Sequence, residues 1–281
     1  MTATDSSSVP SAPPRGVVLH PSKGKVIAIT SGKGGVGKTF LSANLAAALT
    51  RRGLRVLVLD ADLGLANLDV VLNLYPKLTL HDVFTGKCTL EEALVQAPGG
   101  FTVLLAGSGM VEYSRLTPEV REDFLRLIGE VVPRFDVVLL DTGAGISDVV
   151  LFALSLASEV LLVATPEPTS LTDAYATIKV LATQQQRQLI RLVVNQAARP
   201  GDGRAITQQL QTVLNRFVGS GKGPGVRLVH MGDIPVDPGV KTAVMRRQLL
   251  LVHTPGCPAA LAVGQIAGRL VDTVLRTHAT A

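Results

Sequence analysis

The sequence lacks the features that mark several common classes of protein. It has no Trp, only 4% aromatic residues and just two cysteines, Cys88 and Cys257, which stand far apart. Isolated cysteines supply neither a disulfide framework nor a CxxC metal pair, and they argue against an iron–sulfur carrier, which needs clustered cysteines. No apolar run reaches the roughly 18 residues that a membrane-spanning helix requires. The first residues also lack the basic-then-apolar order of a signal peptide, so we expect a cytoplasmic protein.

What remains is an aliphatic-rich chain of 281 residues, 47% hydrophobic and 17% charged. A core of Val, Leu, Ile and Ala with few aromatics suits a parallel sheet that is covered by helices. Residues 1–22 are rich in Ser, Pro and Thr and show almost no periodicity. Such a segment cannot bury enough apolar surface to offset its chain entropy. We therefore predict a flexible arm at residues 1–24 and a single domain at residues 25–281.

Short apolar runs alternate with longer helical stretches from Lys25 onward. The helical stretches include Thr39–Arg52, Pro118–Val131 and Thr172–Gln186. Repeated strand–helix alternation predicts crossover units, and hence an α/β fold with a doubly wound, mostly parallel sheet and helices on both faces. The apolar runs that we expect to form strands are Val26–Thr30, Arg55–Asp60, Phe101–Ala106, Asp136–Asp141, Val160–Ala164, Leu189–Asn195 and Val226–Met231.

The first predicted strand runs into a glycine-rich loop that opens the first long helix. The loop matches G-x-x-x-x-G-K-[ST], the pattern of a phosphate-binding loop. Its glycines let backbone N–H groups turn inward around phosphates, and the helix N-terminus adds its dipole. In this pattern Lys38 reaches the β- and γ-phosphates and the Thr39 hydroxyl binds Mg²⁺, so we predict that ATP binds here. The loop consists of Gly32, Lys33, Gly34, Gly35, Val36, Gly37, Lys38 and Thr39.

A dinucleotide-binding fold is the main alternative, because Gly32, Gly34 and Gly37 also match G-x-G-x-x-G. Asp60 even ends the second strand about where such a fold places its ribose-binding acid. A dinucleotide site needs no Lys–Thr pair at the helix start, however, and it leaves Asp141 at the end of another strand unexplained. A triphosphate site with Mg²⁺ accounts for both features, so we favour ATP.

Carboxylates follow two of the predicted strands. Asp60 and Asp62 come after the second strand, and Asp141 ends the fourth. The carboxyl ends of parallel strands meet at one edge of a sheet, and acids beside a triphosphate hold Mg²⁺ or act on water. We predict a metal site of Thr39, Asp60, Asp62 and Asp141, with Asp60 in the outer shell and Asp62 also activating the attacking water. Helix capping is the alternative for Asp60 and Asp62.

The loop contains a second lysine, Lys33, and its sequence Gly-Lys-Gly-Gly-Val-Gly-Lys-Thr resembles the deviant Walker A motif of the MinD/ParA ATPases, which are SIMIBI-type P-loop NTPases. The likeness covers about residues 24–275 and narrows to the FlhG/FleN branch, the regulators of flagellar number. The stretches that carry this narrower resemblance are Leu59–Asp69, Asp141–Asp148, Pro166–Tyr175 and Gly232–Asp237.

This resemblance implies an Mg-dependent ATPase that works as a nucleotide switch, with ATP sandwiched in a homodimer. Lys33 would cross the interface to the partner's phosphates and neutralise transition-state charge there. The implied catalytic set is therefore Lys33, Lys38 and Asp62. The protein partners implied are a flagellar GTPase, switch-complex proteins or transcription regulators.

The resemblance also places the base of the nucleotide. Asn195, at the end of its strand, would bind adenine, because an amide can pair with the edge of the base; a strand-end cap is the alternative for this residue. Pro235, Val236 and Asp237 would wall the base pocket, and Phe40 completes the predicted nucleotide-binding residues.

Members of this branch often carry a C-terminal amphipathic helix that docks on anionic membrane. Here the last helix has one apolar stripe, which we expect to cover the sheet, so a peripheral position at the inner membrane or cell pole stays open. The stripe consists of Val263, Ile266, Ala267, Leu270, Val271, Val274 and Leu275.

The net charge of +5 is unevenly distributed. Residues 182–281 hold 12 Lys/Arg against 4 Asp/Glu, whereas residues 1–181 hold 15 against 18. A basic surface that aids solubility explains this, and so does an anionic partner. The alternative function is therefore a ParA-like partition ATPase that binds nonspecific DNA. Its DNA contacts would include Arg204, Arg216, Lys222, Arg227, Lys241, Arg246 and Arg247.

Overall fold

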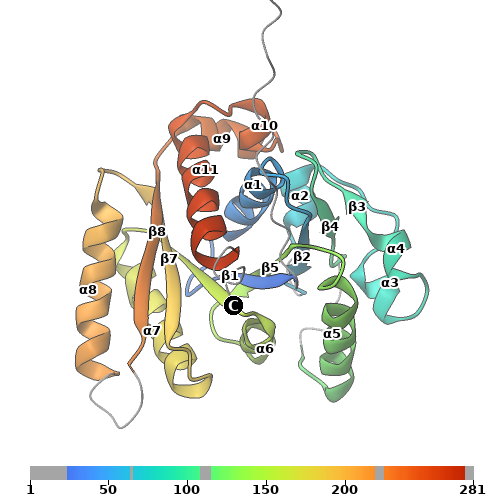
Figure 1. Cartoon of the computed structure of the whole chain (residues 1–281), viewed down its shortest axis with the longest axis horizontal. Coiled ribbons are helices and arrows are strands. Elements are labelled where there is room, and N and C mark those ends of the chain that lie inside the picture. Colours follow the sequence, from blue (N-terminus) through green and yellow to red (C-terminus); the bar gives the residue numbers. More distant parts are fainter. Residues whose placement is uncertain (1–23, 64–65, 108–114, 219–224, 276–281) are drawn as a thin grey trace, which may run out of the picture.

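The computed structural model describes residues 24–63, 66–107, 115–218 and 225–275. One sheet of eight strands runs through this part of the chain in the order β3-β4-β2-β5-β1-β6-β7-β8 (Figure 1). Every neighbouring pair is parallel except β3 and β4, which are antiparallel. The strands are β1 (Lys25–Ser31), β2 (Val56–Ala61), β3 (Val95–Gln96), β4 (Thr102–Leu104), β5 (Val137–Ala144), β6 (Glu159–Ala164), β7 (Leu189–Ala197) and β8 (Arg227–Pro235).

All seven predicted apolar runs overlap a strand, so the expected sheet is confirmed. The two-residue strand β3 was not predicted, because it is too short to carry an alternating pattern. The helices are α1 (Lys38–Thr50), α2 (Leu68–Leu72), α3 (Leu80–Phe84), α4 (Leu90–Ala93), α5 (Pro118–Val131), α6 (Asp148–Leu156), α7 (Pro168–Gln184), α8 (Asp202–Phe217), α9 (Pro238–Met245), α10 (Leu250–His253), α11 (Pro258–Leu270) and the π-helical turn η2 (Val271–Leu275).

The sheet has a separate apolar core on each face, as a doubly wound fold requires. Ile27 and Ile29 of β1 point into a core that includes α1, α2 and α11. Val26 and Ala28, their neighbours along the strand, point into the opposite core, which includes α5, α6, α7 and α8. Figure 1 shows α1 and α11 together on one side of the sheet and α5 and α6 on the other.

The first and last long helices both pack apolar residues into the core of the protein. Ten of the thirteen residues of α1 are buried, from Phe40 to Leu49, because the sheet, α2 and α11 surround it. The apolar stripe of the last helix is also buried, apart from the partly buried Val271. The prediction that this stripe covers the sheet is therefore confirmed, and no helix in the described ranges is long and apolar enough to span a bilayer.

Two predictions concern residues that the structure mostly leaves undescribed. Of the predicted flexible arm at residues 1–24, only Gly24 is described. The glycine-rich sequence of residues 219–225 also predicts a loop between a helix and a strand, and only Gly225 of this segment is described.

Candidate functional site

The phosphate-binding loop connects the end of β1 to the start of α1, at the carboxyl edge of the sheet. Gly35 and Gly37 have φ of +79° and +97°, which side chains other than glycine adopt with strain. A Cβ on Gly32 would lie 2.3 Å from the carbonyl oxygen of Asp173 in α7, so glycine is required at that close approach. Open space surrounds Gly34 and Gly35. The loop therefore has the shape that a phosphate cradle needs.

Lys38 lies on the inner side of this loop. Its Nζ donates a hydrogen bond to Ser31 Oγ over 3.0 Å, and Ser31 Oγ in turn donates to the Lys33 carbonyl. Burial lowers the pKa of Lys38, although the charges of Asp141 and Asp62 act in the opposite direction. The ammonium group is therefore fixed at the cradle and close to two carboxylates, as its predicted role requires.

The three predicted carboxylates meet at this edge. Asp60 of β2 and Asp141 of β5 are register partners in neighbouring strands, and both are almost fully buried. Asp62 follows β2, donates its backbone N–H to Asp60 Oδ1 and lies beside Gly143, where a Cβ would approach its Oδ1 to 3.3 Å. Burial, followed by the charge of Asp141, raises the pKa of Asp60 well above its usual value.

Asp141 is held by residues of α1. Its Oδ1 accepts a 2.8 Å hydrogen bond from Ser42, and Thr39 is also bonded to the carboxylate. Burial raises the pKa of Asp141 to about 6, against the lowering effect of these hydrogen bonds and of Lys38. The sequence did not single out Ser42. Its position four residues after Lys38, one helical turn along, was the available signal.

These residues fit a magnesium ion shared with a phosphate. Asp60 Oδ2 is buried and has no hydrogen-bond partner in the described part of the chain, as expected of an oxygen that faces a metal or its waters. The same ranges contain no group of three or more His, Cys, Asp or Glu that could hold a metal by themselves. Mg²⁺ typically uses one or two protein groups and completes its shell with phosphate oxygens and water.

Lys33 lies on the outer side of the loop. Its Nζ is 3.0 Å from Glu167 Oε2 and 3.0 Å from Thr169 Oγ1, both at the start of α7. The Lys33 side chain is 40% exposed and that of Glu167 is 62% exposed. Within one chain, Lys33 therefore points away from the phosphate cradle, toward a surface where a second subunit has access.

The predicted base-binding residues are anchored by the fold. Asn195 is buried, and its Nδ2 donates to the Val36 carbonyl of the phosphate loop over 2.7 Å. Its Oδ1 accepts from the Gln196 backbone N–H. Asn195 therefore braces the loop, and one N–H of its amide stays uncommitted for a base. Contact with adenine remains a prediction.

Pro235, Val236 and Asp237 leave the end of β8 and lead into α9. Asp237 accepts hydrogen bonds from the Gly239 and Ala259 backbone N–H groups, and the Ala259 bond is the main reason that its pKa is lowered. Val236 is 67% exposed, and its contact with a base remains a prediction. The carboxylate of Asp237 thus joins the starts of α9 and α11, in addition to any contact with nucleotide.

A cavity of about 740 Å³ opens beside the phosphate-binding loop, and its size suits a nucleotide. Its lining does not include the buried carboxylates of Asp60 and Asp141, nor the predicted base-binding residues of β7 and β8. The predicted residues that line it are Gly34, Gly35, Gly37, Lys38, Thr39, Phe40 and Asp62. Its lining also contains residues outside every predicted motif, because they come from separate elements. These are Val71 of α2, Val149 and Val150 at the start of α6, and Val244 of α9. Asn67 and Ser147 line it too, and they lie within two stretches that carry the family resemblance, although the sequence assigned neither a role.

Comparison with known proteins agrees with this geometry. Residues 27–250 match the model of the CobQ/CobB/MinD/ParA nucleotide-binding domain. The chain belongs to this family. The predicted MinD/ParA-type ATPase with its P-loop fold is therefore confirmed, and the dinucleotide-binding alternative is excluded.

Individual members of this nucleotide-binding family cover nearly the whole chain. Antiactivator FleN of Pseudomonas aeruginosa is 42% identical over 252 residues, which is 90% of this chain and 87% of the relative. Flagellum site-determining protein YlxH of Helicobacter pylori is 34% identical and covers 88% of this chain and 82% of its own. Among solved structures, the septum site-determining protein MinD of Pyrococcus horikoshii complexed with Mg-ADP has a TM-score of 0.73 and 26% identity. It covers 92% of this chain and 99% of its own.

Proposed function

We propose that this ATPase is a nucleotide switch that dimerises around Mg-ATP and controls the number or placement of flagella. The observation that carries the proposal is the 42% identity with antiactivator FleN over nearly the full length. The similarity to a flagellum site-determining protein supports the same process. The complete phosphate cradle, with its carboxylates in place, supports the enzymatic part.

The residues on the inner side of the phosphate-binding loop bind and orient the triphosphate. The backbone N–H groups of Gly34, Gly35 and Gly37 cradle phosphate oxygens, and Lys38 neutralises the charge that develops on the γ-phosphate. Thr39 and Asp141 would hold Mg²⁺, which stabilises the charge on the β- and γ-phosphates. Asp62, beside Gly143, orients the attacking water and accepts its proton.

Dimerisation brings in the outer residues. To reach the partner's phosphates, Lys33 must release its hydrogen bonds to Glu167 and Thr169. The contact it gives up is a surface ion pair, worth about 1 kcal/mol or less. The contact it gains is a charge-assisted bond to a desolvated phosphate, which is stronger. The switch therefore favours the dimer only when a γ-phosphate is present.

A sizing experiment tests the switch. The full chain is analysed by light scattering with Mg-ADP and with Mg and a non-hydrolysable ATP analogue, and we expect a monomer in the first case and a dimer in the second. Lys33→Ala should keep monomeric nucleotide binding and lose the dimer, whereas the control Lys179→Ala, on the same helix as Glu167, should dimerise normally. A full dimer of Lys33→Ala would refute the cross-interface role.

The flagellar role needs a cellular test. We expect deletion of the gene in its host to change flagellar number or position, as counted by electron microscopy, and the Asp62→Ala allele to fail to restore it. Normal flagellation after deletion would refute this part of the proposal and leave the ATPase part intact. Protein partners at the flagellar base or among transcription regulators are part of the same proposal, since one relative is an antiactivator.

Nonspecific DNA binding is the second candidate, and the basic surface of the second half favours it. The exposed cations fall into two groups, one of Arg204, Arg216 and Arg227 along α8 and the start of β8, and one of Lys241, Arg246 and Arg247 at α9. Lys222 lies outside the described residues. A filter-binding titration with ATP tests this candidate, because phosphate contacts weaken steeply with salt. No ATP-dependent DNA retention at low salt would exclude it.

A further inference from the structure

The outer edge of the sheet contains an irregularity that rearranges side chains. In β8, His230 pairs with Leu192 of β7 but Gly232 pairs with the next residue, Val193, so Met231 is an extra residue in a β-bulge. Gly232 has φ of +150°, and a Cβ there would lie 2.8 Å from Ile266 of α11. Bulges of this kind redirect side chains and are common beside functional sites.

The bulge places His230 and Asp233 on the same side of the strand. Residues three apart in a regular strand face opposite sides, but the extra residue removes that difference. His230 Nε2 lies 2.6 Å from Asp233 Oδ1, and Asp233 Oδ2 accepts the Gly203 backbone N–H in the first turn of α8. The carboxylate is therefore already paired, and it orients the histidine ring through Nε2.

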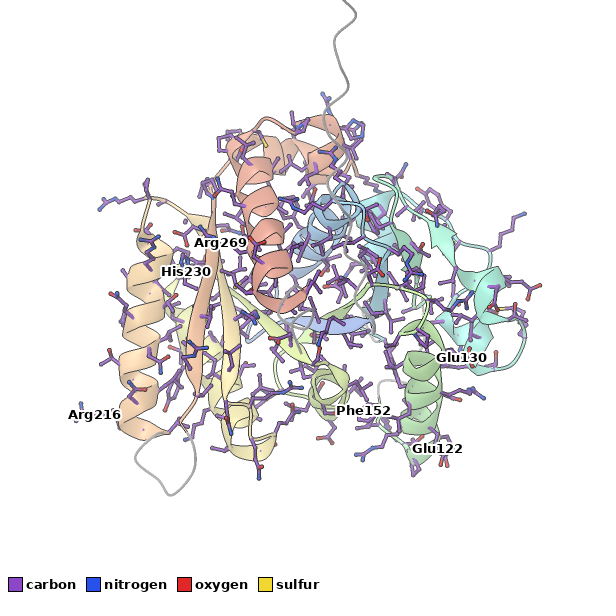
Figure 2. The ribbon with its side chains drawn as sticks, in the orientation of Figure 1. Glu122, Glu130, Phe152, Arg216, His230 and Arg269 are labelled. Atoms are coloured by element: carbon purple, nitrogen blue, oxygen red, sulfur yellow. The ribbon has the colours of Figure 1, made fainter. Side chains whose placement is uncertain are left out.

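Two arginines from different helices complete the group. Arg269 of α11 donates through Nη1 to the Met231 carbonyl over 2.8 Å, and Arg204 is exposed on the first turns of α8. Figure 2 labels Arg269 of α11 and His230 of β8 near each other, and both line the same cavity. With the bulge they enclose a cavity of about 300 Å³, whose lining has two guanidinium groups and only one carboxylate.

We propose that this β8-edge pocket, formed by Arg204, His230, Asp233 and Arg269, binds a phosphate-type oxyanion, either free or as part of a larger group. Guanidinium groups match phosphate oxygens in charge and geometry. The only acid in the lining is paired with His230 and Gly203, so it opposes a bound anion less than a free carboxylate would. The site is separate from the nucleotide cavity, because the two cavities share no lining residue.

The direct test follows the His230 ring by NMR while inorganic phosphate is added to the full chain saturated with Mg-ADP. Saturation with Mg-ADP occupies the phosphate loop, and His230→Gln identifies the ring signals. We expect a saturable shift of these signals that sodium chloride at equal ionic strength does not reproduce. Arg204→Ala should weaken the binding at least tenfold, whereas Arg216→Ala, which changes another exposed arginine near the opposite end of α8, should change it less than twofold.

A second arm distinguishes the source of the phosphate group. Vesicles of phosphatidic acid are titrated in place of free phosphate, with the same variants. A shift with free phosphate assigns the pocket to soluble ligands, and a shift that needs the vesicles and is lost in Arg204→Ala assigns it to lipid headgroups. The proposal is overturned if neither probe shifts the ring signals, or if Arg204→Ala and Arg216→Ala respond alike. Arg204 is exposed, so its variant should fold.

Discussion

Lys38 and Lys33 lie five residues apart in one loop, yet their surroundings are opposite. Lys38 is on the inner side, bonded to Ser31 and close to the buried Asp141. Lys33 is on the outer side, 40% exposed, and its partner Glu167 is 62% exposed. The inner side of the site is thus complete within one chain, whereas the outer side ends at a surface.

This difference assigns nucleotide binding to the inner side of the loop and ATP-dependent dimerisation to its outer side. The buried carboxyl groups of Asp60 and Asp141 are held close together, and burial raises the pKa of both. The fold therefore disfavours their ionised forms. Such an arrangement is stabilised when a cation and phosphates arrive, which suits tight nucleotide binding. Exposed pairs such as Lys33–Glu167 are weak and exchange easily, which suits a contact that must be remade in a dimer.

The largest expected effect is at Asp62, which lies where the inner and outer sides meet. Replacing Asp62 with Ala should lower ATP turnover about 10²- to 10⁴-fold, because the group that accepts the proton of the water is lost. Nucleotide affinity and ATP-dependent dimerisation should persist, since neither depends on this carboxylate. Steady-state hydrolysis and light scattering measure the two properties separately. Unchanged hydrolysis would contradict the assigned role, and Asp69→Ala, in the nearby α2, is the matched control.

The inner side predicts an unusual dependence of stability on pH. Asp141 has a pKa of about 6 in the folded state and about 3.8 when unfolded, so between these values the folded state holds the extra proton. The contribution of Asp141 to the free energy of unfolding of the nucleotide-free protein should therefore fall as pH rises from about 4 to about 6, by on the order of 3 kcal/mol. Asp60 acts in the same direction.

Urea unfolding at several pH values measures this slope. Asp141→Asn should flatten the curve, because the amide does not titrate, and saturating Mg-ADP should also flatten it by compensating the ionised carboxylates. If the wild-type protein and Asp141→Asn showed the same slope between about pH 4 and 6, the pKa of Asp141 would not be raised by its burial, and the contrast between the two sides of the site would be lost.

The sequence could predict the inner side well, because a few local motifs determine it. The Gly32–Thr39 loop and the strand–helix alternation are short-range patterns, and both are where they were expected. The carboxylates are at the expected edge of the sheet, although β2 and β5 extend beyond Asp60 and Asp141, to Ala61 and Ala144. The interior of the sheet followed from uninterrupted apolar runs, such as that of β1. The roles of individual site residues stay predictions even where their positions agree.

What the sequence could not predict depends on distant elements meeting. Ser42 bonds to Asp141 across 99 residues, and Asn195 reaches the Val36 carbonyl across 159. The bulge at Met231 is also invisible in the sequence, because Gly232 could equally mark a turn. In each case the packing of the sheet determines which residues meet, and no local sequence pattern encodes that packing.

The smallest expected effect is at Glu167, and it tests the outer side alone. Glu167→Gln removes the charge that holds Lys33 within its own chain but keeps a hydrogen-bonding side chain of similar size. Because an exposed ion pair contributes about 1 kcal/mol or less, the concentration of non-hydrolysable ATP analogue needed for half-dimerisation should fall up to about fivefold. Monomeric affinity for ADP should not change, since Glu167 does not line the nucleotide cavity. If Glu167→Gln instead weakened the dimer, Glu167 would have to contact the partner subunit directly. The outer side of the loop would then be part of the dimer interface, in addition to restraining Lys33.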